Sequence, residues 1–230
     1  MRGRFLAAIT VALAAGASGC YVGLHPIVTD DVRVFEPALV GSWEEKGETN
    51  PEVWVFKPTP AGEPEAYIVE ITQMQSKPFS DERPAPVTAS FDGRLARLGD
   101  LLILEIVLDR KKALGPLEQH GLVASSLVPA YTFFRVSLEK EALTLLAIDP
   151  EWMDKAIRSK AIQVSHEHLD ADANPHEGGQ PDLHPPRHGP EGEDWVLLTA
   201  PTSQLQALVR KHGKSGLFKE DDAGEFVRRK

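Results

Sequence analysis

The stretch "LVGSW", residues 39–43, begins a series of short segments that combine β-branched and aromatic residues. It is followed by "VWVF" (53–56) and "AYIVEITQM" (66–74), and stretches rich in proline, glycine and glutamate separate the three segments. Segments of this length and composition, bounded by such residues, are typical of β-strands. This part of the chain therefore predicts a run of strands.

The strand pattern continues through the middle of the chain. Between Val87 and Leu98 apolar and polar residues alternate, which is the two-residue period of a half-buried strand. Gly99-Asp100 then supplies a tight turn before the aliphatic run Leu101–Leu108. Further strands are expected at Tyr131–Leu138, Leu143–Ile148 and Glu225–Arg228. Seven strands in close succession, with a closing strand near the C-terminus, predict an antiparallel meander.

Two helices are expected in the C-terminal part of the chain. Asp149-Pro150-Glu151 offers an N-cap, a proline at the first helical position and an acidic first turn, and Arg158 and Lys160 suit the other end. The second helix should run from about Pro201 to His212, with Gly213 as its stop. Its apolar stripe includes His212, which we interpret as a histidine at the boundary of the core.

Gly41-Ser42-Trp43, on the first predicted strand, is similar to the Gly-x-Trp motif of lipocalin-like (calycin) barrels. The resemblance implies a mainly β fold with minor α, in which an antiparallel meander forms a lipocalin-like barrel with two packing helices near the C-terminus. It also implies that Trp43 plugs one barrel end and that Arg228, or Arg229, crosses its ring through cation–π attraction and hydrogen bonds to carbonyls. The chain differs from the family in placing its helices before the last strand. The alternative is a core tryptophan in any β-sheet.

The N-terminus has the order of a secretory signal peptide: Arg2 and Arg4, an apolar run from Phe5 to Ala15, and then small residues. Ala17-Ser18-Gly19-Cys20 resembles the lipobox of bacterial lipoproteins, and Cys20 is the only cysteine in the chain. The resemblance implies cleavage before Cys20 and its acylation with chains such as palmitate, and two or three acyl chains anchor a protein stably. We therefore predict a signal peptide at 1–19, a lipidated tether at 20–36 and a single β-barrel domain at 37–230.

The charge of the chain limits its partners. Loss of Arg2 and Arg4 with the signal peptide leaves 23 basic residues against 34 acidic ones, a net charge near −11. This balance argues against nucleic acid and against electrostatic attachment to anionic lipid. The expected partner is a membrane, reached through the lipid anchor. In the lipoproteins of well-studied Gram-negative bacteria, an aspartate directly after the cysteine favours retention in the inner membrane. Tyr21 stands at that position here, so we expect a place in the bacterial cell envelope, at the outer membrane and facing the periplasm.

Residues 165–194 are rich in histidine, proline and glycine. Five of the eight histidines lie here, among five prolines and eight carboxylates: His166, His168, His176, His184 and His188. Such a composition cannot bury a core and predicts a mobile, solvated loop. The alternative is weak binding of Zn²⁺, Cu²⁺ or Ni²⁺ by these imidazoles and carboxylates. The run from His166 to Asp170 looks like the start of the metallo-β-lactamase motif, but Ala171 replaces its final histidine and we reject that match.

No motif of a known catalytic site or dinucleotide cofactor is present, so we expect neither enzyme activity nor a cofactor. Glu70, Glu105 and Arg135 are charged residues within strand patterns. They would bind a polar ligand or act in acid–base chemistry if they pointed into the barrel, but we expect them on its outer, solvated face.

We interpret the chain as a membrane-anchored, non-enzymatic lipoprotein that binds a small apolar ligand or acts as an envelope scaffold. The alternative is a metal-binding envelope protein that uses the histidine-rich loop.

Overall fold

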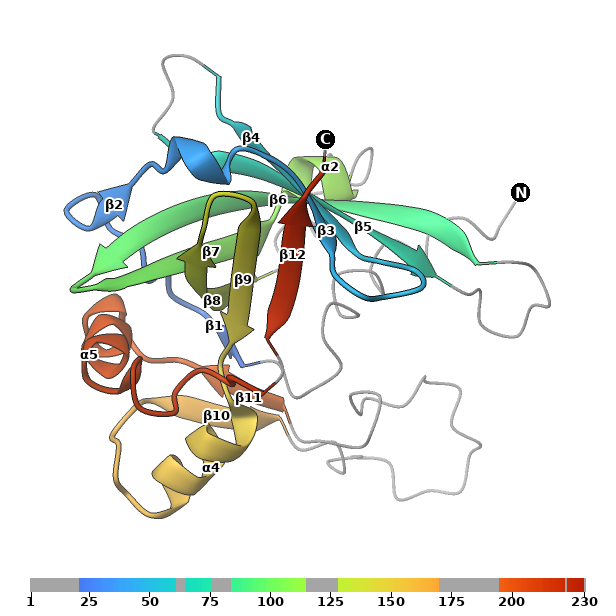
Figure 1. Cartoon of the computed structure of the whole chain (residues 1–230). Helices are drawn as coiled ribbons and strands as arrows, with labels where there is room; N and C mark the ends of the chain where they lie inside the picture. Colours follow the sequence, from blue (N-terminus) through green and yellow to red (C-terminus); the bar gives the residue numbers. More distant parts are fainter. Residues whose placement is uncertain are drawn as a thin grey trace.

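In a computed structural model of the chain, the molecule is built around a closed barrel of eight antiparallel strands (Figure 1). The structure describes residues 21–60, 65–75, 84–114, 128–169, 195–221 and 223–229. The barrel strands are β3 (Gly41–Glu45), β4 (Val53–Pro58), β5 (Tyr67–Gln75), β6 (Ala85–Leu98), β7 (Leu101–Leu108), β8 (Tyr131–Leu138), β9 (Ala142–Ala147) and β12 (Gly224–Arg228). β3 to β9 pair in chain order, and β12 closes the ring between β9 and β3. The predicted mainly β class and antiparallel meander are confirmed, and the barrel has lipocalin-like geometry.

A two-residue turn joins β6 and β7. Leu98 of β6 pairs with Leu101 of β7, so that only Gly99 and Asp100 form the connection. Gly99 has φ +66°, a conformation that glycine adopts without a steric penalty. A positive φ at the first turn position matches the right-handed twist of the flanking strands. The predicted hairpin is therefore present with the expected turn.

Residues 21–36 do not form the predicted tether but belong to the folded domain. β1 (Val22–Gly23) lies between β8 and β11, β2 (Arg33–Val34) pairs with β6, and the short 3-10 helix η2 (Pro37–Leu39) leads into β3. The side chains of Tyr21, Ile27 and Val28 are buried. The tether prediction is wrong here because this segment gains its order from partners far away in the sequence, which a local hydrophobic period does not reveal.

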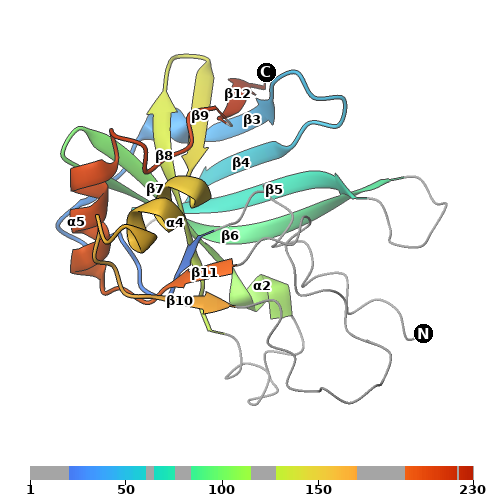
Figure 2. The ribbon, with the colours of Figure 1, turned by 90° about the horizontal axis from the view of Figure 1, so that it is seen from below.

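The remaining elements gather beside the barrel and are named the annex here: β1, β10 (His166–Leu169), β11 (Trp195–Leu198), α4 (Pro150–Arg158) and α5 (Thr202–His212). β10, β11 and β1 extend the sheet from one edge of β8 (Figure 2). The first residues of the predicted loop at 165–194 thus form a strand rather than a loop. A further short helix, α2 (Arg110–Leu114), follows β7.

The two predicted helices are present, with one difference in how the second ends. The Asp149 side chain caps α4 by accepting a hydrogen bond from the Trp152 backbone N–H at 3.1 Å. Gly213 caps α5 with a right-handed φ of −64° and not with the left-handed conformation that a glycine stop suggests. A Cβ at Gly213 would lie 2.4 Å from Leu101 Cδ1. The same Cβ would lie 2.6 Å from the Val209 carbonyl oxygen, so a side chain at this position would have to displace both Leu101 and the end of α5.

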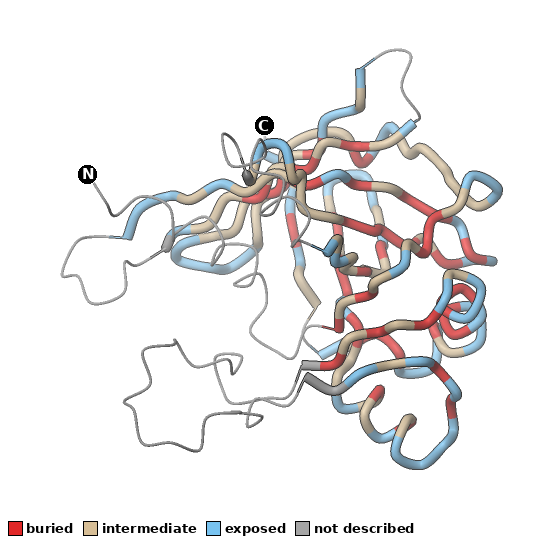
Figure 3. Tube along the Cα trace, turned by 180° about the vertical axis from the view of Figure 1, so that it is seen from behind, coloured by how far each residue is buried: buried red, intermediate tan, exposed pale blue. Residues whose placement is uncertain are grey.

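Two hydrophobic cores share the barrel wall. The inner core fills the barrel with side chains from all eight strands: Trp43, Trp54, Phe56, Tyr67, Val69, Ile71, Phe91, Leu95, Leu104, Ile106, Val136, Leu143, Leu145 and Phe226, with Leu39 of η2. The outer core lies between the barrel and the annex, and β7 contributes Leu101 and Ile103 to it. β7 contributes side chains to both cores and is therefore buried on both faces, which explains its nearly continuous aliphatic sequence. Figure 3 shows how the buried residues are distributed along the chain. Among the described residues there is no helix with the length and apolar character of a membrane span.

Candidate functional site

One end of the barrel is closed around Trp43. Its side chain is fully buried, and its indole N–H donates a hydrogen bond to the Leu39 carbonyl at 2.9 Å. Arg228 pairs with Trp43 across β12 and β3, and its Cζ lies 4.3 Å from the centre of the Trp43 ring. This is the arrangement that the Gly-x-Trp resemblance implied. Arg229, the other candidate, instead forms an ion pair with Glu44 at 3.5 Å.

The Arg228 guanidinium also binds the backbone that enters β3. Nη1 donates to the Val40 carbonyl at 3.0 Å and Nη2 to the Ala38 carbonyl at 2.5 Å. Gly41 permits this approach, because a Cβ at that position would lie 2.5 Å from Nη1. Gly41 also has φ +143°, which side chains other than glycine rarely adopt. The glycine and the arginine are thus one structural unit, which ties the last strand of the barrel to the first.

Aromatic rings fill the middle of the barrel. Trp54, directly opposite Trp43 in the β3–β4 register, is 2% exposed. Its ring stacks on Phe56 at a centroid distance of 5.9 Å and meets the edges of Phe134 at 5.6 Å and Phe226 at 6.0 Å. These rings come from β4, β8 and β12, so the cluster bridges the barrel from wall to wall. At this level the interior is occupied by the protein itself.

A partly buried carboxylate binds the polar edge of this cluster. The Trp54 indole N–H donates to one oxygen of Glu52 at 2.8 Å, and the Gln73 amide donates to the other. Burial raises the pKa of Glu52, the nearby Glu45 carboxylate raises it further, and the two hydrogen bonds oppose the shift. Both carboxylate oxygens already have a partner, so this group satisfies the buried indole and is not arranged as a free acid or base.

Glu70 and Arg135 lie on the outer face of the barrel, as predicted. The Glu70 carboxylate forms an ion pair with Lys57 at 2.6 Å. The Arg135 guanidinium donates to the Gly213 carbonyl at 3.0 Å and pairs with Glu220 at 3.1 Å. Neither side chain therefore offers a ligand site inside the barrel.

Glu105 is also on the outer face, but the prediction that it is solvated is wrong. It is 1% exposed, and the segment at Ile27 and Val28 lies against it. One carboxylate oxygen accepts hydrogen bonds from the backbone N–H groups of Ile27 at 2.5 Å and Val28 at 3.2 Å. The other oxygen has no hydrogen-bond partner and lies 3.8 Å from Arg94. Burial raises the pKa of Glu105, while the two N–H donors and the nearby guanidinium oppose the shift.

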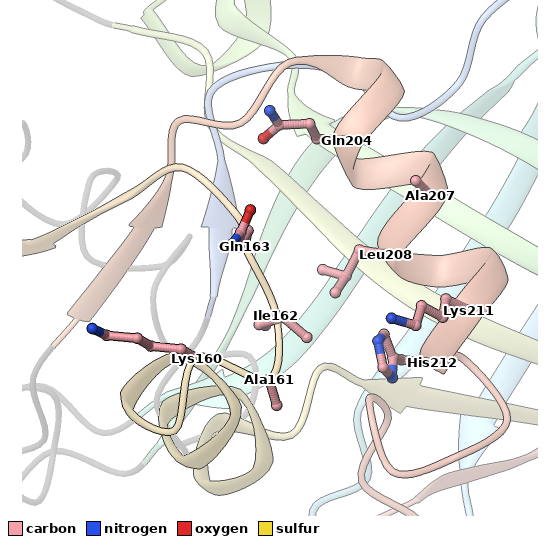
Figure 4. Close-up of a pocket in the computed structure, with 9 residues that line it drawn as sticks. All are labelled: Lys160, Ala161, Ile162, Gln163, Gln204, Ala207, Leu208, Lys211 and His212. Atoms are coloured by element: carbon pink, nitrogen blue, oxygen red, sulfur yellow. The ribbon is translucent and has the colours of Figure 1, made fainter.

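A groove of about 350 Å³ lies in the annex, between α5 and the segment that follows α4 (Figure 4). Apolar side chains of Ile162 and Leu208 form its floor, Gln163 and Gln204 lie toward one end, and Lys211 and His212 lie toward the other. Lys211 points into the groove and forms no ion pair within the described part of the chain. Burial, with a smaller contribution from the Lys211 charge, lowers the pKa of His212, whose ring lies 5.2 Å from that of Trp152.

The edge of this groove holds the only non-glycine residue with positive φ among the described residues, Lys160 at φ +57°. The Ala161 N–H bonds to the Ala156 carbonyl at 2.9 Å and the Lys160 N–H to the Ile157 carbonyl at 2.9 Å. This is a Schellman motif, in which glycine usually occupies the position that Lys160 takes. The signal of this groove in the sequence is the last turn of α5, which carries the basic residues Arg210, Lys211 and His212.

The predicted metal ligands are only partly within the described residues. His166 and His168 lie on β10, and the His166 Nδ1 is 2.8 Å from the Val164 carbonyl. His176, His184 and His188 lie outside the described residues. Among the residues that the structure describes, no three histidine, cysteine, aspartate or glutamate side chains are grouped to hold a metal ion. The histidine-loop interpretation therefore stays a prediction.

Cys20, the predicted lipid attachment site, also lies outside the described residues and directly precedes the first of them. Comparison of the chain with models of protein families, with curated proteins and with solved structures finds no match.

Proposed function

We propose that this chain is a lipoprotein of the bacterial cell envelope, cleaved before Cys20, acylated there and held at the outer membrane facing the periplasm. We further propose that its calycin-type barrel acts as a scaffold rather than as a carrier of a small apolar ligand. The order of basic, apolar and small residues before Cys20 supports the anchor. The aromatic cluster around Trp54 is the observation that carries the scaffold role.

The size of the barrel makes this cluster informative. An eight-stranded barrel has an interior that is either just filled by side chains or able to hold one small ligand. Here all eight strands contribute buried side chains to the inner core, and three aromatic neighbours surround Trp54. Ligand sites in proteins usually have volumes of about 300–1,000 Å³. Because side chains occupy the interior where a carrier would hold its ligand, this packing favours a role for the outer surface of the domain.

The scaffold role is tested by emptying the barrel. In Trp54→Ala the loss of the indole should destabilise the fold by about 3–5 kcal/mol and leave a cavity. An apolar cavity of this kind binds benzene or similar molecules. We expect isothermal titration calorimetry with benzene and with indole to detect binding to Trp54→Ala but not to the parent protein. Val55→Ala, which changes the outward-facing neighbour on β4, should gain no binding.

A carrier would give the opposite result. If the parent protein binds either probe and Trp54→Ala binds it more weakly, the barrel is a ligand site and the scaffold proposal fails. The comparison does not depend on membrane attachment, because it uses the folded domain in solution.

The anchor is tested separately at Cys20. Metabolic labelling with a radioactive fatty acid should mark the parent protein and leave Cys20→Ser unmarked, as an uncleaved precursor of higher mass. If the serine variant still incorporates label, lipid is attached at another residue.

A further inference from the structure

The folded domain begins directly after the proposed lipid attachment site. Tyr21 is 5% exposed, belongs to the outer core, and its hydroxyl donates to the Pro150 carbonyl at 3.4 Å. Consecutive Cα atoms are about 3.8 Å apart. Cys20 is therefore within one residue of the core, whereas a free tether over residues 21–36 would reach up to about 55 Å if fully extended.

Backbone pairing fixes the next residues on both sides. Val22 pairs with Leu197 of β11 in parallel and with Thr132 of β8 in antiparallel register. The Leu24 N–H donates to the Leu198 carbonyl at 2.9 Å. A strand held between two neighbours cannot swing on either side without breaking both ladders.

Side chains of α5 and β7 fix residues 26–29. The Thr202 hydroxyl donates to the Pro26 carbonyl at 2.6 Å. Gln206 donates to the Ile27 carbonyl at 2.9 Å and to the Thr29 hydroxyl at 3.1 Å. The same stretch donates its N–H groups at residues 27 and 28 to the buried Glu105 carboxylate. Buried polar contacts of this number hold a segment in one conformation, because each lost partner leaves an unsatisfied group.

We propose that the lipid anchor holds this domain against the bilayer in one fixed orientation, with α4 beside the lipid headgroups and the β8–β9 hairpin away from them. This inference rests on the proposed acylation of Cys20. Burial of Tyr21 against Pro150 places the start of α4 next to the attachment point. The β8–β9 hairpin lies at the far end of β9, whose six residues span about 20 Å. Figures 1 and 2 show α4 and this hairpin at opposite ends of β8 and β9.

The charge of α4 suits this position. The chain as a whole is strongly acidic, which opposes contact with anionic lipid. α4 instead carries two carboxylates, Glu151 and Asp154, and two cations, Lys155 and Arg158, so it has no net side-chain charge. The helix can lie at a headgroup surface without the repulsion that the rest of the molecule would meet.

Two exposed lysines make a matched pair of probe positions. Lys155 lies on α4 and Lys140 at the tip of the β8–β9 hairpin, and neither forms an ion pair with a described residue. A fluorescent amino acid is incorporated at either position in the chain that begins at Cys20, which retains every residue that the structure describes. The Cys20 thiol is coupled to a maleimide lipid in vesicles that also contain a lipid with a nitroxide on its headgroup. This coupling makes the measurement independent of acylation in cells.

We expect the nitroxide to quench the probe at position 155 several-fold more than the probe at position 140. Insertion of twelve glycine and serine residues between Cys20 and Tyr21, with an r.m.s. length of about 20 Å, should bring the two values together. Equal quenching at the two positions without the insertion would overturn the fixed orientation, as would a difference that the insertion leaves unchanged. A protein that shows the expected difference here but takes up no fatty acid in cells would refute the anchor alone.

Discussion

Replacement of Arg228 by alanine tests how the barrel is closed. The guanidinium lies 4.3 Å from the Trp43 ring centre, where a cation–π interaction contributes about 0.5–2 kcal/mol. Its two hydrogen bonds, to the Val40 and Ala38 carbonyls, contribute about 1 kcal/mol each. The Arg228 backbone N–H still donates to the Glu141 carbonyl in the variant, so strand pairing is kept. We therefore expect Arg228→Ala to lower the free energy of unfolding by about 2–4 kcal/mol.

The next residue supplies the control. Arg229 has the same charge and lies on the same strand end, but its contact is an exposed ion pair with Glu44, which contributes about 0–1 kcal/mol. Arg228→Lys keeps the charge but cannot bind both carbonyls with one planar fork, so its loss should be intermediate. Urea unfolding followed by tryptophan fluorescence gives the midpoint and slope for the parent and the three variants.

The ranking of the variants decides the matter. If Arg228→Ala loses no more stability than Arg229→Ala, the contact of the guanidinium with Trp43 does not stabilise the fold, and Arg228 does not hold the barrel closed. A marked fall of the unfolding slope in Arg228→Ala alone would also contradict it, because the slope reports the surface exposed on unfolding and a simple loss of stability leaves it unchanged.

Four further predictions concern Glu105, Lys160 and the histidine-rich loop. Glu105→Leu leaves the N–H groups of Ile27 and Val28 without an acceptor and should cost about 2–5 kcal/mol in urea unfolding, far more than Glu105→Gln. Burial raises the pKa of Glu105 above its ordinary 4.5, so between that value and the raised pKa the folded protein retains a proton that the unfolded chain loses. The stability that this group contributes therefore falls as the pH rises from 4.5 through the raised pKa. Glu105→Gln should remove this part of the pH dependence. Lys160→Gly removes a side chain from a left-handed backbone conformation and should raise the free energy of unfolding by about 1 kcal/mol in urea unfolding; a variant that is less stable than the parent would contradict this. Deletion of residues 171–193 should cost little stability, because closing a shorter loop costs less entropy. In the parent protein we expect no specific rise in melting temperature with Zn²⁺. A rise that is lost when the five histidines of 165–194 become alanine would favour the metal-binding alternative instead.

The barrel could be predicted because its signals are local. Alternation within β6, the Gly99-Asp100 turn and the proline at the start of α4 each act within a few residues, and all three are found where expected. The Gly-x-Trp resemblance added a long-range contact, between Trp43 and Arg228, that no local pattern contains. In this chain, short-range patterning is sufficient to define the order of the strands.

The annex could not be predicted for the opposite reason. β1 has two residues, too few to show a period, and its partners are separated from it by more than a hundred residues. Glu105 was expected in water because a charged residue in a strand usually faces solvent. Its outer position was right, but Ile27 and Val28 cover it, and Gln206 of α5 binds the Ile27 carbonyl, so the cover forms only in the folded molecule. Gly213 likewise carried a stop signal, while a Cβ there would meet both the Leu101 side chain and the Val209 carbonyl.

The chain order of these contacts bears on how the proposed anchor forms. The strands that pair with β1, which are β8 and β11, and the start of α4, which accepts the Tyr21 hydrogen bond, all follow Tyr21 by more than a hundred residues. The strand that closes the barrel, β12, lies near the C-terminus. While these segments are still absent or unpaired, the residues around Cys20 have no fixed partners and can reach a membrane-bound modifying enzyme as an extended chain. Once the annex is complete, Tyr21 is buried and the distance available to Cys20 shrinks to about one residue. Acylation should therefore precede docking of β1, and a chain folded before it meets the acylating enzyme should be a poorer substrate than the unfolded one, measured as the initial rate of lipid incorporation.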